Sequence, residues 1–251
     1  MIKDIIKKVV DKQNLTLEEA KTAMDAILGG GATHAQISAY LTALRMKGET
    51  IDEITGSAMK LGEKACHLAP KIDGYIDCVG TGGDCTNTFN ISTTAAFVIA
   101  GAGVPVAKHG NRAISSRSGS ADVLEALGIK IDLEPEKVTT CLEKIGIGFM
   151  YARTFHKSMK MVSEVRADLS MRTIFNILGP LSNPSQAKFQ VIGVYDKFLT
   201  NPLANAMKNT GVVSGMVVSG FSDGMDEIST TGETAVSEIK DGEIKNYIIT
   251  P

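Results

Sequence analysis

The chain has 251 residues, of which 43% are hydrophobic and 22% are charged, enough for one large domain or two modest ones. Its formal net charge of −2 argues against a nucleic-acid partner, and no apolar run is long enough to span a membrane. The first twelve residues mix apolar and charged side chains, so we expect no signal peptide.

The cysteines give no sign of a metal site or of a disulfide framework. The four positions are Cys66, Cys78, Cys85 and Cys141, and no two of them form a CxxC pair. We therefore expect reduced thiols and a cytoplasmic protein.

Residues 1–70 are predicted to be helical. One apolar helix face is formed by Ile2, Ile5, Ile6, Val9 and Val10. Three pairs have the spacing of a capping box, and these are Thr16 with Glu19, Thr33 with Gln36, and Thr50 with Glu53. Gly29 and Gly48 stand where helices should end, and Pro70 closes the segment. No catalytic pattern is evident, so we expect packing or a subunit interface here.

Beyond Pro70, strands and helices alternate, which predicts an α/β sheet. The expected strands are 75–79, 104–107, 129–133, 147–151, 189–195 and 212–219. The expected helices are 92–100, 121–127, 136–145, 159–178 and 203–208, with Pro180 and Pro184 ending the fourth. Two last strands, 234–239 and 244–249, flank Asp241-Gly242, which is typical of a hairpin.

The run from Asp77 to Thr93 begins within the first expected strand and continues into a loop that contains Gly80, Gly82 and Gly83. Glycine permits positive φ and close approach to the backbone, and a glycine turn that opens toward a helix aims N–H groups at an anion. The loop therefore suits a phosphate or pyrophosphate. A tight turn followed by a helix cap explains the glycines equally well, and neither the P-loop nor the Rossmann pattern is present.

Two further loops strengthen the phosphate hypothesis. The segment Lys108–Arg112 follows the next expected strand, and loops at the carboxyl ends of neighbouring strands share one crevice. Lys108 and Arg112 would neutralise phosphate charge there, although a solvated basic turn is the alternative. Asp226 and Glu227 follow another strand and suit Mg²⁺, with Asp84 as a third candidate carboxylate. Adjacent carboxylates on a loop are otherwise ordinary solvated surface.

Taken in order, several segments match one known family. They are Gly80-Thr81-Gly82-Gly83-Asp84, Asn90-Ile91-Ser92-Thr93, Lys108-His109-Gly110-Asn111-Arg112, Asn176-Ile177-Leu178-Gly179-Pro180-Leu181 and Asp226-Glu227. The chain resembles the anthranilate phosphoribosyltransferases over essentially its whole length. The resemblance implies transfer of the phosphoribosyl group from 5-phosphoribosyl 1-pyrophosphate to the amine of anthranilate, with release of pyrophosphate, in tryptophan biosynthesis.

The resemblance also implies an α/β fold with a small N-terminal all-α domain, the two-domain architecture of nucleoside phosphorylases and phosphoribosyltransferases. Residues 1–70 would form the small helical domain and a homodimer interface, and helices around 159–180 could join it. Residues 71–251 would form the large domain that binds phosphoribosyl pyrophosphate. Chains of the family usually continue further, so this large domain is expected to be short at its C-terminus.

Site roles follow from the resemblance position by position. The substrate-binding set is Gly80, Gly83, Asp84, Thr88, Asn90, Ile91, Ser92, Thr93, Lys108, His109, Gly110, Asn111, Arg112, Ala113, Ile114, Ser115, Ser116, Ser120 and Arg166. Within it, Asn111 and Arg166 would hold anthranilate, Arg166 through the substrate carboxylate, and Lys108 would act by position and charge. The metal set is Ser92, Asp226 and Glu227, for two Mg²⁺ ions.

Three points stay open at this stage. His109 and His156 are expected near the path of the aromatic substrate, and each could equally be a packed or solvated histidine. A relative that acts on another aromatic amine or on a nucleobase is an alternative, although a nucleobase does not explain Arg166. A truncated, non-catalytic ligand-binding form is the other alternative.

Overall fold

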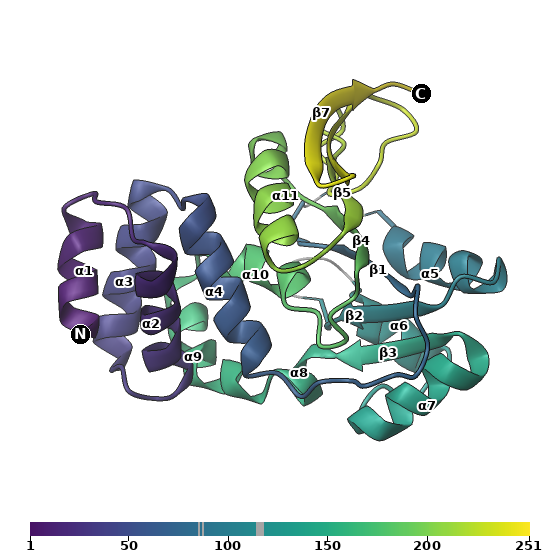
Figure 1. Cartoon of the computed structure of the whole chain (residues 1–251), viewed down its shortest axis with the longest axis horizontal. Coiled ribbons are helices and arrows are strands. Elements are labelled where there is room, and N and C mark those ends of the chain that lie inside the picture. The colour runs from purple at the N-terminus through teal and green to yellow at the C-terminus, as the bar shows by residue number, and fades with distance from the viewer. Residues whose placement is uncertain (85, 87, 114–117) are drawn as a thin grey trace.

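The computed structural model describes residues 1–84, 86, 88–113 and 118–251, and it shows a helical bundle beside an α/β unit (Figure 1). The bundle consists of α1 (Ile2–Val10), α2 (Leu17–Leu28), α3 (His34–Lys47) and α4 (Ile51–Glu63). All three predicted capping boxes are confirmed, with both reciprocal hydrogen bonds present at the start of α2, α3 and α4. Gly29 and Gly48 cap the C-terminal ends of α2 and α3, as predicted.

One seven-stranded sheet forms the centre of the α/β unit, in the order β3-β2-β1-β4-β5-β6-β7. The parallel strands are β1 (Ile76–Gly80), β2 (Val106–Gly110), β3 (Ile147–Tyr151), β4 (Phe189–Gly193) and β5 (Ser214–Ser219). The hairpin of β6 (Thr234–Lys240) and β7 (Glu243–Ile249) continues the sheet in antiparallel fashion. Because the order changes direction between β1 and β4, their carboxyl ends frame the crevice where α/β sheets usually bind ligands.

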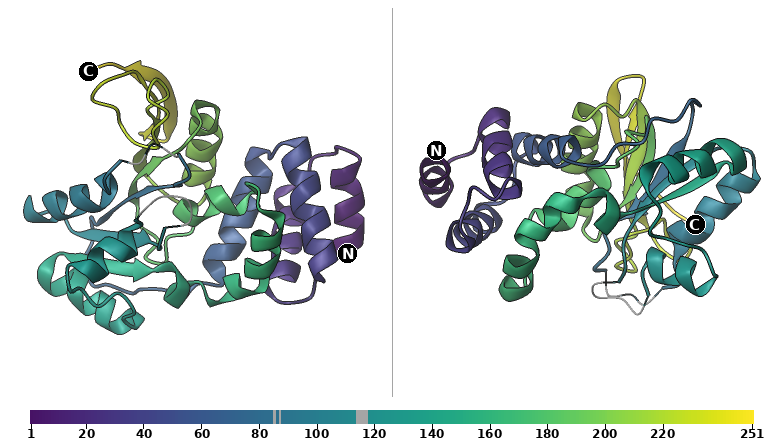
Figure 2. Two further views of the ribbon diagram at one scale, coloured as in Figure 1. Left: turned by 180° about the vertical axis from the view of Figure 1, so that it is seen from behind. Right: turned by 90° about the horizontal axis from the view of Figure 1, so that it is seen from below.

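The remaining helices cover the sheet and join it to the bundle. They are α5 (Ile91–Gly101), α6 (Ser120–Ala126), α7 (Pro135–Ile145), α8 (Ala152–Phe155), α9 (Lys160–Leu169), α10 (Phe175–Leu181) and α11 (Thr200–Asn209). Short 3-10 turns span Lys157–Met159 and Lys197–Leu199. Helix α9 contacts α2 and α3, and α10 contacts α4 and α11, as Figures 1 and 2 show.

The largest hydrophobic core is continuous between the two parts of the molecule. It contains buried side chains of the bundle, such as Tyr40 and Leu44, together with Val162 of α9 and Leu178 of α10. The same cluster includes Val217 of β5 and side chains of β4 and α11. The bundle and the sheet are therefore held together by shared apolar burial, which is the dominant stabilising term in a fold of this size.

Three predictions about secondary structure are wrong. Residues 129–133 form no strand, because only Ile131 is buried there, where it packs against Ala121 and Leu124 of α6. The expected helix 159–178 is interrupted at Ser170, which takes a left-handed conformation with φ of 46° and ends α9. Pro180 does not end α10 but lies inside it, one residue before the helix ends at Leu181.

Cys66, Cys78 and Cys141 are free, whereas Cys85 lies outside the described residues. Within the described ranges, no helix is long and apolar enough to cross a membrane.

Candidate active site

The glycine loop begins where β1 and β4 end. These strands pair in register, so that Gly80 lies opposite Gly193, and the Thr81 N–H donates to the Gly193 carbonyl at 2.9 Å. Gly82 and Gly83 follow with φ of +69° and +77°. Two successive residues in the left-handed region are accessible at low cost only to glycine, which explains the pair.

Asp226 fills the space that two of the glycines leave. Its Oδ2 accepts the Gly82 N–H at 2.6 Å. A Cβ on Gly80 would lie 2.5 Å from that same oxygen, and a Cβ on Gly193 would lie 1.6 Å from the Asp226 carbonyl oxygen. Gly80 therefore makes room for a carboxylate of the protein itself, and not only for the ligand that the sequence led us to expect.

Asp226 and Glu227 form a crowded acidic pair. Burial, followed by the charge of Asp84, raises the pKa of Asp226 to about 6. Burial, followed by the charge of Asp226, raises the pKa of Glu227 to about 7, although Lys108 and the Ser92 backbone oppose this rise. The three carboxylates thus concentrate negative charge at the end of the sheet, where a cation would relieve it.

Lys108 lies beneath this acidic group and is almost completely buried, with 2% of its surface exposed. Its Nζ donates to the Cys78 carbonyl at 2.6 Å and lies 3.3 Å from Ser92 Oγ. A buried ammonium group needs such partners. Lys108 therefore joins the middle of β1 to the first turn of α5 and lies close to Ser92 and to the carboxylate of Glu227.

The first turn of α5 also contacts the second predicted loop. Asn90 Nδ2 donates to the Ser118 carbonyl at 3.0 Å, and Thr93 Oγ1 donates to Ser120 Oγ at 2.9 Å. Because Ser118 and Ser120 lie in the segment that continues from Lys108–Arg112, these contacts bring the segments that follow β1 and β2 together, as predicted. Three of the predicted substrate-binding residues, Ile114, Ser115 and Ser116, lie outside the described residues.

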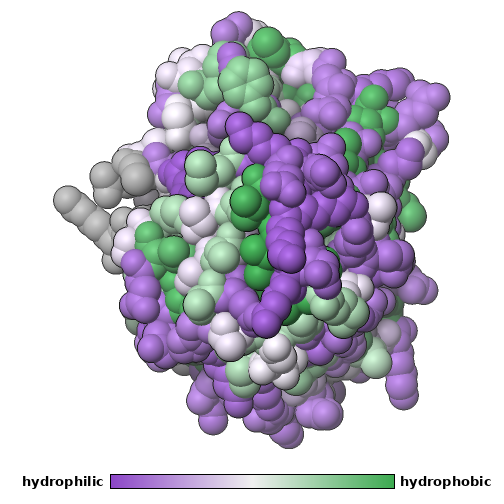
Figure 3. Space-filling view, turned by 90° about the vertical axis from the view of Figure 1, so that its left-hand side faces the viewer, coloured by the Kyte–Doolittle hydropathy of each residue, from purple (hydrophilic) through white to green (hydrophobic). Residues whose placement is uncertain are grey.

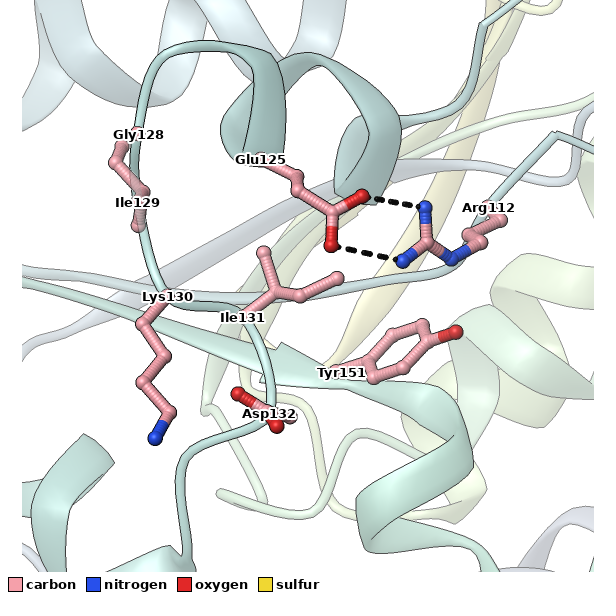
Figure 4. Close-up of a pocket in the computed structure, with 8 residues that line it drawn as sticks. All are labelled: Arg112, Glu125, Gly128, Ile129, Lys130, Ile131, Asp132 and Tyr151. Carbon is pink, nitrogen blue, oxygen red and sulfur yellow. Dashed lines mark hydrogen bonds and ion pairs between the residues drawn. The ribbon is translucent and has the colours of Figure 1, made fainter.

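Arg112 is engaged with α6, as Figure 4 shows. Its guanidinium group forms ion pairs with Glu125 at 2.8 Å and with Asp122 at 3.0 Å, and it lies over the ring of Tyr151. Arg112, Glu125 and Tyr151 line a surface hollow of about 500 Å³. Two carboxylates already neutralise Arg112, so its expected contact with phosphate stays a prediction that would require these ion pairs to open.

Arg166, unlike Arg112, has no carboxylate partner among the described residues. It lies on α9, and its guanidinium carbon is 5.6 Å from the centre of the Phe175 ring. Burial lowers its pKa, and no ion pair to it is present among the described residues. A half-buried cation without a carboxylate partner suits an anionic ligand.

The two histidines lie together, with ring centres 5.0 Å apart. Burial, reinforced by the proximity of His156, lowers the pKa of His109 well below its usual value, and burial lowers the pKa of His156 to about 4. Both imidazoles are therefore neutral at physiological pH. The sequence did not single out Asp77, whose carboxylate accepts the backbone N–H of His109 at 3.2 Å and a side-chain amide hydrogen of Gln190 at 3.1 Å.

The structure thus gathers Gly80, Asp84, Ser92, Lys108, Asp226 and Glu227 at one point. Within the described residues, no hydrogen bond or ion pair joins Asn111 or Arg166 to this group. Gly193 is a further site residue that sequence reasoning missed, because a glycine at a strand end has many structural explanations. Asp77 could have been found as a charged residue inside an apolar strand.

The acidic group also fits a magnesium ion. No set of three or more His, Cys, Asp or Glu side chains in the described ranges is arranged as a complete metal site. Mg²⁺ does not need one, because it is commonly held by one or two carboxylates together with substrate phosphates and water. Asp226 and Glu227, with their raised pKa values, provide such a pair.

A change of Asp226 to Asn is expected to stabilise the fold at pH 8 when no divalent cation is present. The raised pKa means that the native state binds a proton more tightly than the unfolded chain, so stability falls as pH rises from about 4 to about 6. The variant carries no titrating carboxylate at this position and avoids this loss. Its free energy of unfolding at pH 8 should therefore exceed that of the unmodified chain by on the order of 2 kcal/mol, which corresponds to about 4–8 °C in Tm. Thermal melting between pH 4.5 and pH 8 measures the effect.

The matched control is Glu233→Gln, which removes an exposed carboxylate from the same segment. Its Tm difference from the unmodified chain should stay small and constant with pH. A difference for Asp226→Asn that did not grow as pH increased would contradict the raised pKa.

Comparisons with known proteins identify the family. A model described as "Glycosyl transferase family, a/b domain" matches residues 73–251, and its helical bundle counterpart matches residues 3–65. An anthranilate phosphoribosyltransferase from Acetivibrio thermocellus is 57% identical over 251 residues, which cover 100% of this chain and 72% of the relative. The chain belongs to the anthranilate phosphoribosyltransferase family. A relative from Methanobrevibacter smithii is 53% identical, and the chain covers 74% of it.

Solved structures of anthranilate phosphoribosyltransferases agree with the fold. The enzyme from Thermus thermophilus is 43% identical, with a TM-score of 0.92 over 99% of this chain and 73% of that one. The enzyme from Saccharomyces cerevisiae, in complex with PRPP and Mg, is 29% identical, with a TM-score of 0.87 over 99% and 72%. The predicted fold class, α/β with a small N-terminal all-α domain, is confirmed.

Proposed function

We propose that the crevice between β1 and β4 carries out the reaction of the anthranilate phosphoribosyltransferase family, an enzyme activity of tryptophan biosynthesis. In this reaction the amine of anthranilate attacks C1 of phosphoribosyl pyrophosphate, and pyrophosphate leaves. The observation that carries the proposal is the convergence of the glycine loop, Lys108, Ser92 and the carboxylates of Asp226 and Glu227 at that crevice.

The donor would lie against the glycine loop and the first turn of α5. Backbone N–H groups there and the partial positive charge of the helix N-terminus favour an anion. Ser92, Asp226 and Glu227 would hold magnesium, two ions in our proposal, which would offset the charge that develops on the leaving pyrophosphate. Lys108 holds Ser92 and β1, through the Cys78 carbonyl, in place and adds positive charge beside them.

The acceptor needs orientation more than activation. Arg166 would bind the anthranilate carboxylate, and Asn111 would help to place the ring. An aromatic amine is already a nucleophile, so correct placement supplies much of the rate. A covalent intermediate on Cys78 is disfavoured, because burial raises the pKa of its thiol to about 11.

Two alternatives follow from different uses of the same site. A relative that acts on a nucleobase or on another aromatic amine would retain the phosphate-binding loop, but a nucleobase leaves the unpaired charge of Arg166 unexplained. A non-catalytic form would bind phosphoribosyl pyrophosphate without turnover, which calorimetry alongside an activity assay would reveal.

The deciding experiment follows anthranilate fluorescence after phosphoribosyl pyrophosphate and Mg²⁺ are added to the purified chain. Loss of fluorescence that requires the chain, phosphoribosyl pyrophosphate and Mg²⁺ together would establish the reaction. If a folded protein gives no loss while calorimetry detects the donor, the non-catalytic or alternative-acceptor proposal replaces it.

A change of Arg166 to Ala is expected to raise the KM for anthranilate about tenfold to a hundredfold, because a charge-assisted contact with the carboxylate is lost. The KM for phosphoribosyl pyrophosphate should change less than threefold. Steady-state kinetics with each substrate varied in turn gives both values. Arg153→Ala, which removes an exposed arginine from α8, is the matched control. Equal increases in both KM values would contradict the assignment.

We also propose that residues 1–70 mediate a homodimer. Val10 on α1 is 59% exposed and Met46 next to the end of α3 is 79% exposed, and Figure 3 shows apolar groups among hydrophilic ones on this side of the molecule. Exposed apolar groups of this kind support an interface between copies of the chain. A monomeric mass by light scattering at micromolar concentration would contradict this proposal.

A further inference from the structure

An arginine outside the family motifs described above contacts the glycine loop. Arg172 lies in the short segment between α9 and α10. Its Nη2 donates a hydrogen bond to the Gly83 carbonyl. Its guanidinium carbon lies 3.8 Å from the centre of the Tyr195 ring. The guanidinium group is thus placed by two partners, one in the loop and one after β4.

The Tyr195 ring, on which this guanidinium group stacks, is held in place by its neighbours. It follows Val194, whose N–H donates to the Val218 carbonyl at 2.8 Å and so extends the pairing of β4 with β5. Tyr195 is half-buried and packs against the main hydrophobic core. A planar guanidinium stacks on an aromatic face in a way that an ammonium group does not, which makes arginine specific at this position.

The Gly83 carbonyl is the third fixed point of the glycine loop. The Thr81 N–H is bound by Gly193 and the Gly82 N–H by Asp226, whereas Gly83 is bound through its oxygen. Because the peptide group is planar and trans, fixing this oxygen on one side directs the Asp84 N–H to the opposite side. Arg172 therefore sets the orientation of the peptide that links Gly83 to Asp84.

The same residue connects the loop to the helix that carries Arg166. Arg172 stands three residues after the end of α9 at Leu169, and α9 packs on α2 and α3 of the bundle. A change in the position of α9 would therefore move the guanidinium relative to Gly83. The donor loop and the proposed acceptor helix are linked through one side chain.

We propose that Arg172 is a positioning residue for phosphoribosyl pyrophosphate, which holds the Gly83 carbonyl so that the glycine loop keeps the geometry that binds the donor. The proposal rests on the proposed function, because it takes the loop to be the donor site. Arg172 acts through the loop and is not itself a catalytic residue.

The test compares Arg172→Met, which keeps most of the side-chain length, with Arg172→Lys, which keeps the charge. Calorimetric titration with phosphoribosyl pyrophosphate in the presence of Mg²⁺ should show affinity reduced about tenfold for Arg172→Met, as expected for loss of a charge-assisted hydrogen bond and a stacked cation. Arg172→Lys should recover only part of this loss. The KM for the donor should rise similarly, with kcat and the KM for anthranilate changed less than threefold.

Three controls separate positioning from a general structural role. Arg153→Met removes an exposed arginine elsewhere and should leave donor affinity unchanged. Tyr195→Phe keeps the aromatic ring and should also leave donor affinity unchanged. Tyr195→Leu removes the platform, and its effect on donor affinity should be smaller in the Arg172→Met background than alone, as for two residues that act together.

The outcomes are distinct from those of the proposed function. If the unmodified chain neither binds the donor nor turns it over, the proposed function fails and this inference fails with it. If the unmodified chain binds the donor and Arg172→Met binds it equally well, the inference alone is overturned. A lower Tm for Arg172→Met with unchanged donor affinity would likewise assign Arg172 a structural role and overturn it.

Discussion

The double change Asp226→Asn and Glu227→Gln is expected to lower kcat/KM for phosphoribosyl pyrophosphate about a thousandfold. These two residues supply the carboxylates of the proposed magnesium site, and a bound metal ion contributes several kcal/mol of transition-state stabilisation. Kinetics at saturating anthranilate across a range of Mg²⁺ concentrations measures the effect. Adding more Mg²⁺ should recover little of the activity, because the amides are much weaker ligands.

This variant separates loss of function from loss of fold. The two acids carry raised pKa values, so neutralising them should leave the chain at least as stable at pH 7 as the unmodified protein. An inactive variant with an unchanged or higher Tm would support the metal assignment. Glu233→Gln, the exposed control, should keep full activity. A double variant that retained full Mg²⁺-dependent activity would refute the assignment.

The site also illustrates why enzymes retain unfavourable charges. Asp226 and Glu227 are buried beside one another and beside Asp84, and this burial, followed by the repulsion between the carboxylates, costs stability at neutral pH. The same arrangement raises affinity for a divalent cation, because the cation relieves the repulsion. Affinity for Mg²⁺ should therefore fall as pH falls through about 7 and 6, when Glu227 and then Asp226 take up protons.

Sequence reasoning predicted the features that local chemistry determines. The capping boxes at Thr16, Thr33 and Thr50 depend on residues three apart, and all three are confirmed. The hairpin around Asp241-Gly242 is another local pattern, and β6 and β7 pair as expected. The alternation of strands and helices was also sufficient to predict an α/β sheet whose loops share one crevice at the carboxyl ends of neighbouring strands.

Features that depend on distant contacts were missed. Ile131 lies in a segment with a strand-like pattern, but its one buried side chain packs on α6 and the segment pairs with no strand in the described structure. Ser170 ends α9 in a left-handed conformation, and the glycine that usually marks such a helix end in a sequence is absent at this position. The part played by Asp77 depends on Gln190, which is 113 residues away in sequence. Such contacts exist only once the sheet has formed.

Gly193 is the clearest example of a residue whose role depends on a contact distant in sequence. A Gly193→Ala change is expected to destabilise the fold by about 3 kcal/mol or more. The added Cβ would lie 1.6 Å from the Asp226 carbonyl oxygen, which is backbone and cannot rotate away. The segment that carries Asp226 and Glu227 would have to move away from β4. Urea denaturation measures the loss of stability, and titration with Mg²⁺ and phosphoribosyl pyrophosphate measures the damage to the site.

Alanine substitutions at two other glycines provide comparisons for Gly193→Ala. Gly101→Ala is the control, since no atom outside its immediate neighbours lies within 4 Å of the added Cβ, and it should change stability by less than about 1 kcal/mol. Gly80→Ala meets a carboxylate oxygen of Asp226 at 2.5 Å, which can move with its side chain. It should therefore cost less stability than Gly193→Ala while still weakening Mg²⁺ binding, because the displaced oxygen belongs to the proposed metal ligand. A Gly193→Ala variant as stable and active as the unmodified chain would show that the Asp226 segment does not need its close approach to β4.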